Sequence, residues 1–441
     1  MKTKIVLLVV LLSTLSTFSQ KKWTLKECVD YALKNNITIK QNQLSLELAE
    51  KDVDIAKGNF LPDLNASANG SFSSGLSQDR SGVLKNTQNF SSSFNLSSGV
   101  TIFNGYRNLN TFKQAKLGVE SSKLDLEVIQ NDISLRVINT YLNVLFAKEN
   151  LEVAKIQAEI SKKQINRAQA QFDAGAIPKG DLLNVQSTAA NDLQNVVTQE
   201  NSLNLALLQL AQLLQISADD FDVEKIEIDS PSSALLYNSS RQVYDKALTL
   251  RPEIEKAKLA IDNSDLDIKI AKGNYLPSLS LNFGAGSSYF HQFNNIIFPN
   301  DYFFKQINDR MRYSVGASLN IPIFNRFQTK NRVAKSVINK KVSELSLENQ
   351  KLQLQQTIEQ AFLDAKAAAK AFEAAQISLE AQKEAFKNAQ VSYDYGSMTQ
   401  FDFDQVKNRL VNSEGAMIRA KYDYVFKTKV LKFYFGESIV D

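Results

Sequence analysis

A nine-residue motif that occurs twice limits what this 441-residue chain can fold into more than any other feature. Residues 56–64 read AKGNFLPDL and residues 271–279 read AKGNYLPSL, at an offset of 271 − 56 = 215 positions. Further along, residues 172–175 and 393–396 share an aromatic-Asp-x-Gly pattern at an offset of 393 − 172 = 221. The second copy therefore contains 221 − 215 = 6 additional residues. Such self-similarity predicts that the chain consists of two structural repeats.

Each repeat is predicted to fold as a helix, two strands, a long helix, a turn and a last helix. Thr24 and Glu27 form a capping box, in which each side chain satisfies a backbone N–H at the start of the first helix. At about 1.5 Å per residue, each long helix approaches about 100 Å, a length typical of coiled-coil packing. The predicted elements are helix 24–57, strands 62–76 and 89–103, long helix 107–172 and helix 179–216 in repeat 1 (20–216), a linker or equatorial segment over 217–240, and helix 241–272, strands 278–290 and 310–324, long helix 328–393 and helix 400–434 in repeat 2 (241–441).

Residues 1–19 are expected to be a cleaved secretory signal peptide. They combine a basic start at Met1–Lys4 with an apolar run at Ile5–Leu12 and small residues before Gln20. As a helix, that run would cover only about 12 Å, against roughly 30 Å for a bilayer core, so a membrane anchor is the weaker interpretation. No later window approaches the roughly 18 consecutive apolar residues of a membrane helix, so a mature chain that crosses a membrane must do so as a closed β-barrel.

Four segments alternate between apolar residues and Ser, Asn or Gly, which is the two-residue period of a β-strand. The segment 64–73 is the clearest case, since its even positions are apolar or small and its odd positions are polar. The polar face carries almost no charge, which favours a water-filled lumen on one side and lipid on the other over an ordinary soluble sheet. Four strands leave two open edges, and the smallest bacterial barrels have about eight strands, so we expect several chains to share one barrel.

Composition excludes several classes of function. The 51 Lys and Arg residues against 47 Asp and Glu residues give a net charge of +4, and loss of Lys2 and Lys4 with the signal peptide leaves 4 − 2 = +2, so no nucleic acid partner is expected. One cysteine and one histidine cannot build a disulfide framework or an ordinary His/Cys metal site, so we expect no metal and no cofactor. Cys28 is predicted to be a buried helix thiol, and His291 a surface residue of the aromatic-rich loop 289–309.

The duplicated motifs together resemble the outer-membrane efflux protein family, the TolC-like export ducts of Gram-negative envelopes. They are the Leu-Pro-x-Leu strand starts at 61–64 and 276–279, the strand ends at 102–105 and 321–325, and the two Gly-centred turns. The resemblance covers nearly all of the mature chain. It implies a mostly α-helical protein with a membrane β-barrel: a homotrimer whose shared barrel of 3 × 4 = 12 strands continues into a periplasmic α-helical coiled-coil barrel.

The same resemblance implies a function and partners. The protein would be the outer-membrane exit duct of a tripartite efflux or type I secretion system. Its helices would extend into the periplasm, its strands would contact outer-membrane lipid, and a periplasmic adaptor protein and an inner-membrane pump would be its partners. A passive porin is one alternative, although a porin spends most of its chain on strands. A periplasmic coiled-coil scaffold is another. An enzyme is the poorest alternative, because no nucleophile elbow, phosphate loop or acid pair accompanies the repeats.

The two turns between the long and last helices would form the periplasmic tip, according to the resemblance. Gly175 and Gly396 are expected to adopt positive φ there as helix C-caps, and to leave backbone open for the adaptor. The best-known members of the family carry a basic latch residue where this chain has Met398. The predicted docking residues are Gly175, Ala176, Ile177, Gly396, Ser397 and Met398.

Residues that follow each turn are candidates for a gate. Asp181 and Asp402 stand six residues beyond the two glycines, near the start of the next helix, where a carboxylate favours the helix dipole. Capping is one role for them, and in a threefold assembly an inward-facing carboxylate also becomes a ring of like charge. The family has a second Asp where this chain has Gln405, with Asp404 beside it, and a tip aromatic that matches Tyr393. The predicted gate residues are Asp402, Asp181, Tyr393 and Gln405.

Overall fold

The computed structural model describes residues 22–78, 82–226, 237–293 and 300–438, and the predicted signal peptide lies outside them. None of the described helices has both the length and the apolar character that a membrane-spanning helix requires. Each of the two compact units takes segments from both repeats, so the units cut across the predicted division of the chain by repeat. Unit 1 comprises residues 1–43, 125–254 and 349–441, and unit 2 comprises residues 44–124 and 255–348.

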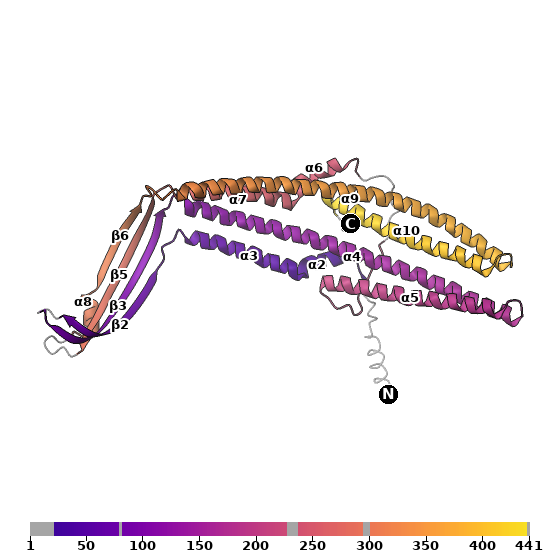
Figure 1. Ribbon diagram of the computed structural model, residues 1–441, viewed down its shortest axis with the longest axis horizontal. Coiled ribbons are helices and arrows are strands. Elements are labelled where there is room, and N and C mark those ends of the chain that lie inside the picture. The colour runs from indigo at the N-terminus through magenta and orange to yellow at the C-terminus, as the bar shows by residue number, and fades with distance from the viewer. Residues whose placement is uncertain (1–21, 79–81, 227–236, 294–299, 439–441) are drawn as a thin grey trace, which may run out of the picture. The chain divides into compact units, whose positions relative to one another are not determined.

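Four helices of the first repeat have counterparts of equal length in the second. Each repeat has helices of 11, 22, 67 and 36 residues in this order. In Figure 1, α5 runs back beside α4, and α10 runs back beside α9, so each repeat contributes one helical hairpin. The bounds are α2 Leu25–Asn35, α3 Ile37–Gly58, α4 Arg107–Asp173, α5 Lys179–Leu214, α6 Ser240–Leu250, α7 Pro252–Gly273, α9 Gln328–Asp394 and α10 Gln400–Phe435.

The first helix of each repeat is broken, and the two breaks occupy equivalent positions. The prediction of uninterrupted helices over 24–57 and 241–272 is therefore wrong. Asn36 separates α2 from α3, where its Oδ1 accepts a hydrogen bond from the backbone N of Thr38 at 2.9 Å. Arg251 separates α6 from α7, at an offset of 251 − 36 = 215, and precedes Pro252, which disfavours helical backbone at the residue before it.

The core of unit 1 joins the start of the chain to the linker between the repeats. Strands β1 (Lys22–Trp23) and β4 (Asp222–Val223) pair in parallel, so part of the predicted linker is a strand. The hydroxyl of Tyr141, which is fully buried, lies 3.0 Å from the carbonyl oxygen of Trp23 and 2.8 Å from that of Glu224. Cys28 is fully buried in the same core, which confirms the prediction of a buried thiol. Burial raises its pKa to about 12.

Unit 2 contains one antiparallel sheet with the strand order β2-β3-β5-β6. The strands are β2 Asn65–Gln78, β3 Leu84–Phe103, β5 Ser278–Phe293 and β6 Arg312–Asn320. β6 is nine residues long, so the predicted strand 310–324 is too long at both ends. Its C-terminal end lies before Pro322, whose missing N–H cannot continue the ladder. The strand register agrees with the predicted alternation of polar and apolar residues. The polar residues Asn65, Ser67 and Asn69 of β2 lie opposite the polar residues Ser97, Asn95 and Ser93 of β3.

Two features at the far end of the sheet differ from the sequence prediction. A short helix, α8 (Phe303–Asp309), forms inside the segment expected to be a loop. His291 lies on β5 rather than in that loop, because the strand extends to Phe293. Its ring lies 4.6 Å from that of Phe293, and its Nδ1 lies 3.2 Å from the hydroxyl of Tyr289. The sheet extends beyond the predicted end because β5 pairs with β3 as far as Phe293, opposite Gln88.

Candidate functional site

The two Gly-centred turns have the same backbone geometry. Gly175 has φ +73 and Gly396 has φ +75, which confirms the prediction of positive φ at both. In the first turn, the N–H of Gly175 bonds to the carbonyl of Phe172 at 2.9 Å, and that of Ala176 to the carbonyl of Gln171 at 2.8 Å. The equivalent bonds of the second turn measure 3.1 and 2.9 Å. These paired bonds end the long helices as Schellman-type caps, which require a residue tolerant of left-handed backbone.

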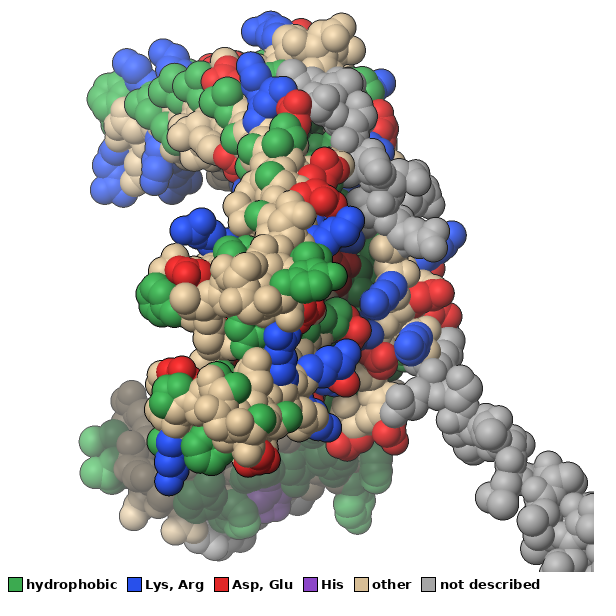
Figure 2. Space-filling model, turned by 90° about the vertical axis from the view of Figure 1, so that its right-hand side faces the viewer, with side chains coloured by type: hydrophobic (Ala, Val, Ile, Leu, Met, Phe, Trp, Pro, Cys, Tyr) green, Lys and Arg blue, Asp and Glu red, His purple; other side chains and the backbone are tan. Residues whose placement is uncertain are grey.

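Both turns present small, exposed residues. A Cβ atom added at either glycine would meet nothing within 4 Å, so the surroundings are open. Ala176 and Ser397 are exposed, whereas Ile177 and Met398 are half-buried. Ile177 packs against the small apolar cluster of Ala168, Leu182 and Val185 between α4 and α5. The turns lie at the right of Figure 1, and the face seen from that side carries Lys, Arg, Asp and Glu interspersed, without a continuous field of one sign (Figure 2).

One arginine of α4 holds the tip of the other hairpin. The guanidinium carbon of Arg167 lies 4.7 Å from the ring centroid of Tyr393, which is cation–π distance. Its Nη2 donates to the carbonyl oxygens of Tyr393 at 3.1 Å and Asp394 at 3.0 Å, and its Nη1 pairs with the Asp394 carboxylate. On its other side, Tyr393 stacks on Phe403 at 4.8 Å between ring centroids, and its hydroxyl donates to Gln400. Burial raises the pKa of Tyr393.

Sequence reasoning missed Arg167 because its partner lies 227 residues away along the chain. The repeats offered one signal. Both tips carry an Asp before the turn, Asp173 and Asp394, yet the position equivalent to Arg167 in the second repeat, 167 + 221 = 388, is Asn388. Asp173 instead accepts a hydrogen bond from Gln169 of its own helix at 2.9 Å. The two tips are therefore chemically different, and only the second is held across hairpins by this contact.

The other predicted gate residues lie outside this cluster. The Thr399 hydroxyl donates to the Asp402 carboxylate at 2.7 Å and accepts from the backbone N of Asp402 at 3.2 Å, so Asp402 takes part in capping α10. Asp181 lies in the first turn of α5, where Pro178 is the N-cap residue without a side-chain bond. Asp181, Asp402 and Gln405 are all exposed. The first turns of α5 and α10 therefore each present a carboxylate to the surface.

A buried ion pair joins three helices deeper in unit 1. The Lys407 side chain of α10 is only 2% exposed, and its Nζ lies 2.7 Å from the Asp192 carboxylate of α5. The Ser161 hydroxyl of α4 lies 2.5 Å from both of these groups. Asp404, one turn from Lys407, is half-buried, and this burial raises the pKa of its carboxyl group. The contacts among Lys407, Asp192 and Ser161 therefore connect the two hairpins at some distance from their tips.

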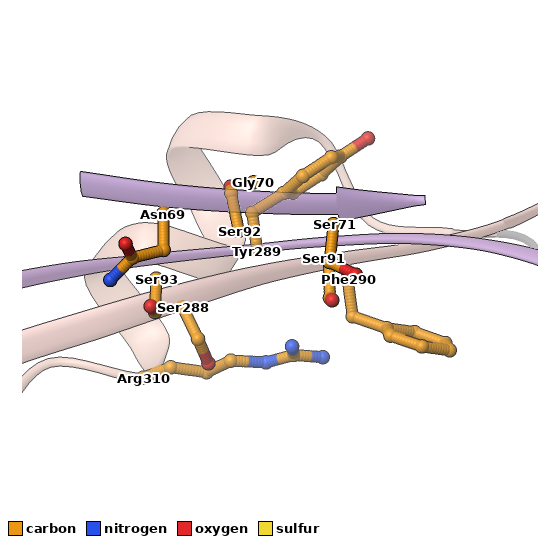
Figure 3. A pocket seen from close by; sticks show the side chains of 10 residues that line it. All are labelled: Asn69, Gly70, Ser71, Ser91, Ser92, Ser93, Ser288, Tyr289, Phe290 and Arg310. Atoms are coloured by element: carbon orange, nitrogen blue, oxygen red, sulfur yellow. The ribbon is translucent and has the colours of Figure 1, made fainter. Parts of the chain in front are cut away.

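The described residues show little that resembles a catalytic or metal site. Among the described ranges, no cluster of three His, Cys, Asp or Glu side chains could hold a metal ion. A hollow of about 440 Å³ lies on the sheet of unit 2, where Ser and Asn side chains of three strands line it with Arg310 (Figure 3). In Figure 3, Ser288 and Arg310 lie next to each other on the same side of the strands as Asn69 and Ser93. The hollow belongs to the polar face of the sheet.

Two long helical hairpins with similar tips and a sheet of four alternating strands are the features to compare with known proteins. The chain belongs to the outer membrane efflux protein family, which matches residues 28–214 and 243–437. It is 22% identical to the outer membrane protein TolC of Escherichia coli (strain K12) over 433 residues, 96% of this chain and 84% of the relative. It is 22% identical to the alkaline protease secretion protein AprF of Pseudomonas aeruginosa over 332 residues, 74% of this chain and 66% of the relative.

The fold matches a solved channel of the same kind. The crystal structure of the Campylobacter jejuni CmeC outer membrane channel superposes with a TM-score of 0.77 at 22% identity, covering 93% of this chain and 85% of that one. Family and fold together confirm the mostly α-helical class with a β-barrel domain, and a location in the outer membrane with helices in the periplasm. They also favour the exit duct for efflux or secretion over a passive porin or a periplasmic scaffold.

Proposed function

We propose that three copies of this chain form one exit duct, loaded by a periplasmic adaptor protein and an inner-membrane pump. The observation that carries the proposal is the exposure of both edge strands: every residue of β2 and every residue of β6 is exposed. Their apolar side chains include Phe72, Leu76, Tyr313 and Val315, which are 60 to 80% exposed. Open strand edges are not stable in lipid, so β2 of one copy is expected to pair with β6 of the next.

Exposed apolar side chains on the helices of unit 1 support the same assembly. On α9, Leu363, Ile377 and Val391 recur at 377 − 363 = 14 residues, two heptads, and are 58%, 64% and 51% exposed. Such stripes are stable when they pack against further helices. Two different stripes on one chain fit a closed ring, in which α5 of one copy contacts α9 of the next. The α5 stripe consists of Leu183, Leu193, Val197, Leu205 and Leu208.

The two turns are the proposed docking points for the adaptor. Gly175 and Gly396 leave open space around the backbone, and Ala176 and Ser397 are small and exposed, so a helical hairpin could approach closely. Ile177 and Met398 supply half-buried apolar contact beside them. The family and the relatives named above are channels and ducts. We therefore also propose that the chain forms a passage for substrates and does not catalyse a reaction.

Large side chains at the turns test this docking. Ala176→Trp and Ser397→Trp should abolish recovery of the adaptor in cross-linked complexes and raise cellular accumulation of a pumped fluorescent dye to the level of a deletion strain. The matched controls Ala176→Ser and Ser397→Ala should behave as wild type, since they stay small. Normal complex formation and normal efflux by both Trp variants would contradict docking at these turns.

The proposed gate combines the contact of Arg167 with Tyr393 and Asp394 and rings of carboxylates. Arg167 contacts Tyr393 and Asp394 and so connects the end of α9 to α4. Asp181 and Asp402 are exposed in the first turns of α5 and α10, where threefold repetition would create rings of carboxylates. Gln405 is exposed one turn further along α10 and would add a neutral ring there.

A further inference from the structure

Strand β5 is longer than the strand that pairs with it on one side. β6 pairs with β5 only as far as Gly286, opposite Arg312, whereas β3 pairs with β5 as far as Phe293. The segment 287–293 of β5 therefore has no neighbouring strand on the β6 side within the described sheet. Helix α8 lies beside this segment, where a longer β6 would otherwise run.

Side-chain amides close this exposed strand edge. Gln306 of α8 accepts a hydrogen bond from the backbone N of Phe290 at 3.1 Å and donates to its carbonyl at 3.0 Å. Asn300 does the same for Gln292, at 3.1 and 2.9 Å. Each primary amide supplies one donor and one acceptor to alternate residues, as a partner strand would. Gln306 is only 3% exposed, so this edge cannot accept another strand without losing α8.

The stagger of the strands sets where a second copy would pair. Asn65 at the start of β2 is level with Ser97, Gly284 and Ser314 through three successive pairings. Aligning Asn65 of the next copy with Asn320, the last residue of β6, shifts the register by 320 − 314 = 6 residues. Closing a barrel requires such a stagger, and an even shift keeps the polar faces on one side.

This register leaves part of β2 without a strand partner. β2 has 14 residues and β6 has nine, so 14 − 9 = 5 residues of β2, Ser74–Gln78, would extend past β6. They would run beside α8 of the neighbouring copy. Apolar surface is exposed on both elements, because Leu76 of β2 is 74% exposed, and Tyr302 and Phe304 at α8 are 87% and 83% exposed.

We propose that α8 is a contact between copies, which stops strand pairing after nine residues and covers the end of β2 from the neighbouring copy. The proposal rests on the proposed shared duct. Gln306 and Asn300 close the β5 edge, so the neighbouring β2 can pair only with β6. Phe303 anchors α8 to the sheet through Phe94 and Tyr289, at 5.9 and 5.1 Å between ring centroids. The neighbouring side chains of Tyr302 and Phe304 are exposed and are available to contact the second copy.

Disulfide cross-linking in outer membranes tests the contact. Ser67→Cys with Ser318→Cys reports the pairing of β2 with β6, because both positions are two residues from the aligned ends. Leu76→Cys with Phe304→Cys reports α8 against β2. Both pairs are expected to give inter-chain dimers and trimers under mild oxidation. Ser67→Cys with Arg312→Cys is the control and should give none, because these two positions would lie opposite each other only without the six-residue shift. The native Cys28 is buried and does not compete.

The outcomes separate this inference from the proposed function. Cross-linking of the strand pair without the Leu76/Phe304 pair would overturn the α8 contact and leave the shared duct standing. Failure of every pair in a protein with the mass of one chain would refute the shared duct itself. A dominant Ser67/Arg312 product would overturn the register. As a second readout, Gln306→Ala should lower the temperature at which the assembled particle dissociates, whereas Asn308→Ala, exposed on the same helix, should not. Equal dissociation temperatures would overturn the edge-closing role of Gln306.

Discussion

The guanidinium carbon of Arg167 lies 4.7 Å from the centroid of the Tyr393 ring, although the two residues belong to different repeats. The same side chain reaches the carbonyl oxygens of Tyr393 and Asp394, so one arginine of α4 holds the end of α9. Charge-assisted hydrogen bonds of this kind are stronger than neutral ones. The tip of the second hairpin is therefore held in place by the first hairpin, and this arrangement makes Arg167 the first target for mutation.

Loss of the Arg167 side chain should loosen the tip. Arg167→Gln removes the cation over Tyr393 and the pair with Asp394, so we expect a severalfold higher mean single-channel conductance in planar lipid bilayers. Lys163→Gln, an exposed charge removal one turn earlier on α4, is the matched control and should leave conductance unchanged. Identical conductance of the Arg167 variant and the control would remove Arg167 from the gate.

Capping and gating by Asp402 can be separated. Asp402→Asn removes the charge, so a ring of three carboxylates would lose its preference for cations, and the reversal potential in a salt gradient should move toward zero. Thr399→Ala keeps the charge but removes the cap, and should cost about 1 kcal/mol of stability without changing selectivity. If Asp402→Asn left selectivity at the wild-type value, Asp402 would be a capping residue alone.

The buried Lys407 is expected to be sensitive to loss of its partner. Asp192→Leu leaves an unpaired charge that is 2% exposed, which should lower the free energy of unfolding by about 3–5 kcal/mol. The double variant Asp192→Leu with Lys407→Met should recover most of that loss, because neither charge remains buried. Denaturant unfolding in detergent measures both. A double variant as unstable as the single one would show that the ion pair itself, not the unpaired charge, stabilises the hairpins.

Stability should depend on pH through Asp404. Burial raises the pKa of its carboxyl group above the ordinary 3.8. The native state therefore holds this proton more tightly, and the resulting stabilisation is complete below the ordinary pKa and lost as the pH rises through the folded value. Asp404→Asn stays neutral, so its melting temperature relative to wild type should increase as the pH rises from about 4 to about 7.

Asp364 supplies a control of opposite sign. The hydrogen bond from Lys427 lowers the pKa of Asp364, so its stabilisation is present above the ordinary pKa and is lost as the pH falls through the lowered value. Asp364→Asn should therefore lose melting temperature relative to wild type as the pH rises. Parallel pH profiles of the Asp404 and Asp364 variants would contradict the assignment of the two shifts.

Local sequence signals predicted much of the fold. The motif at 56–64 and its copy predicted the repeats, and the strand alternation predicted which face of the sheet is polar. The breaks at Asn36 and Arg251 were missed, although Pro252 after Arg251 is an ordinary signal for a helix start. At Asn36 the signal is weaker, because no proline follows it and the Asn36 side chain only caps the start of α3 through the backbone N of Thr38.

Contacts between distant segments could not be predicted from one sequence. A helix C-cap needs only local backbone geometry, so the positive φ of Gly175 and Gly396 was predicted correctly. Arg167 is one of many charged residues along α4, and only the fold brings it to Tyr393. Helix α8 was hidden for a similar reason, since its position depends on Gln306 meeting the backbone of Phe290, 16 residues earlier.

The protein mass of the mature chain in mild detergent, measured by light scattering with the detergent contribution subtracted, tests the central claim most directly. A duct built from shared strands predicts three chains per particle, because the exposed edges of β2 and β6 are then paired between copies. A monodisperse, folded particle of one chain would contradict the account, because four strands with open edges cannot form a duct alone.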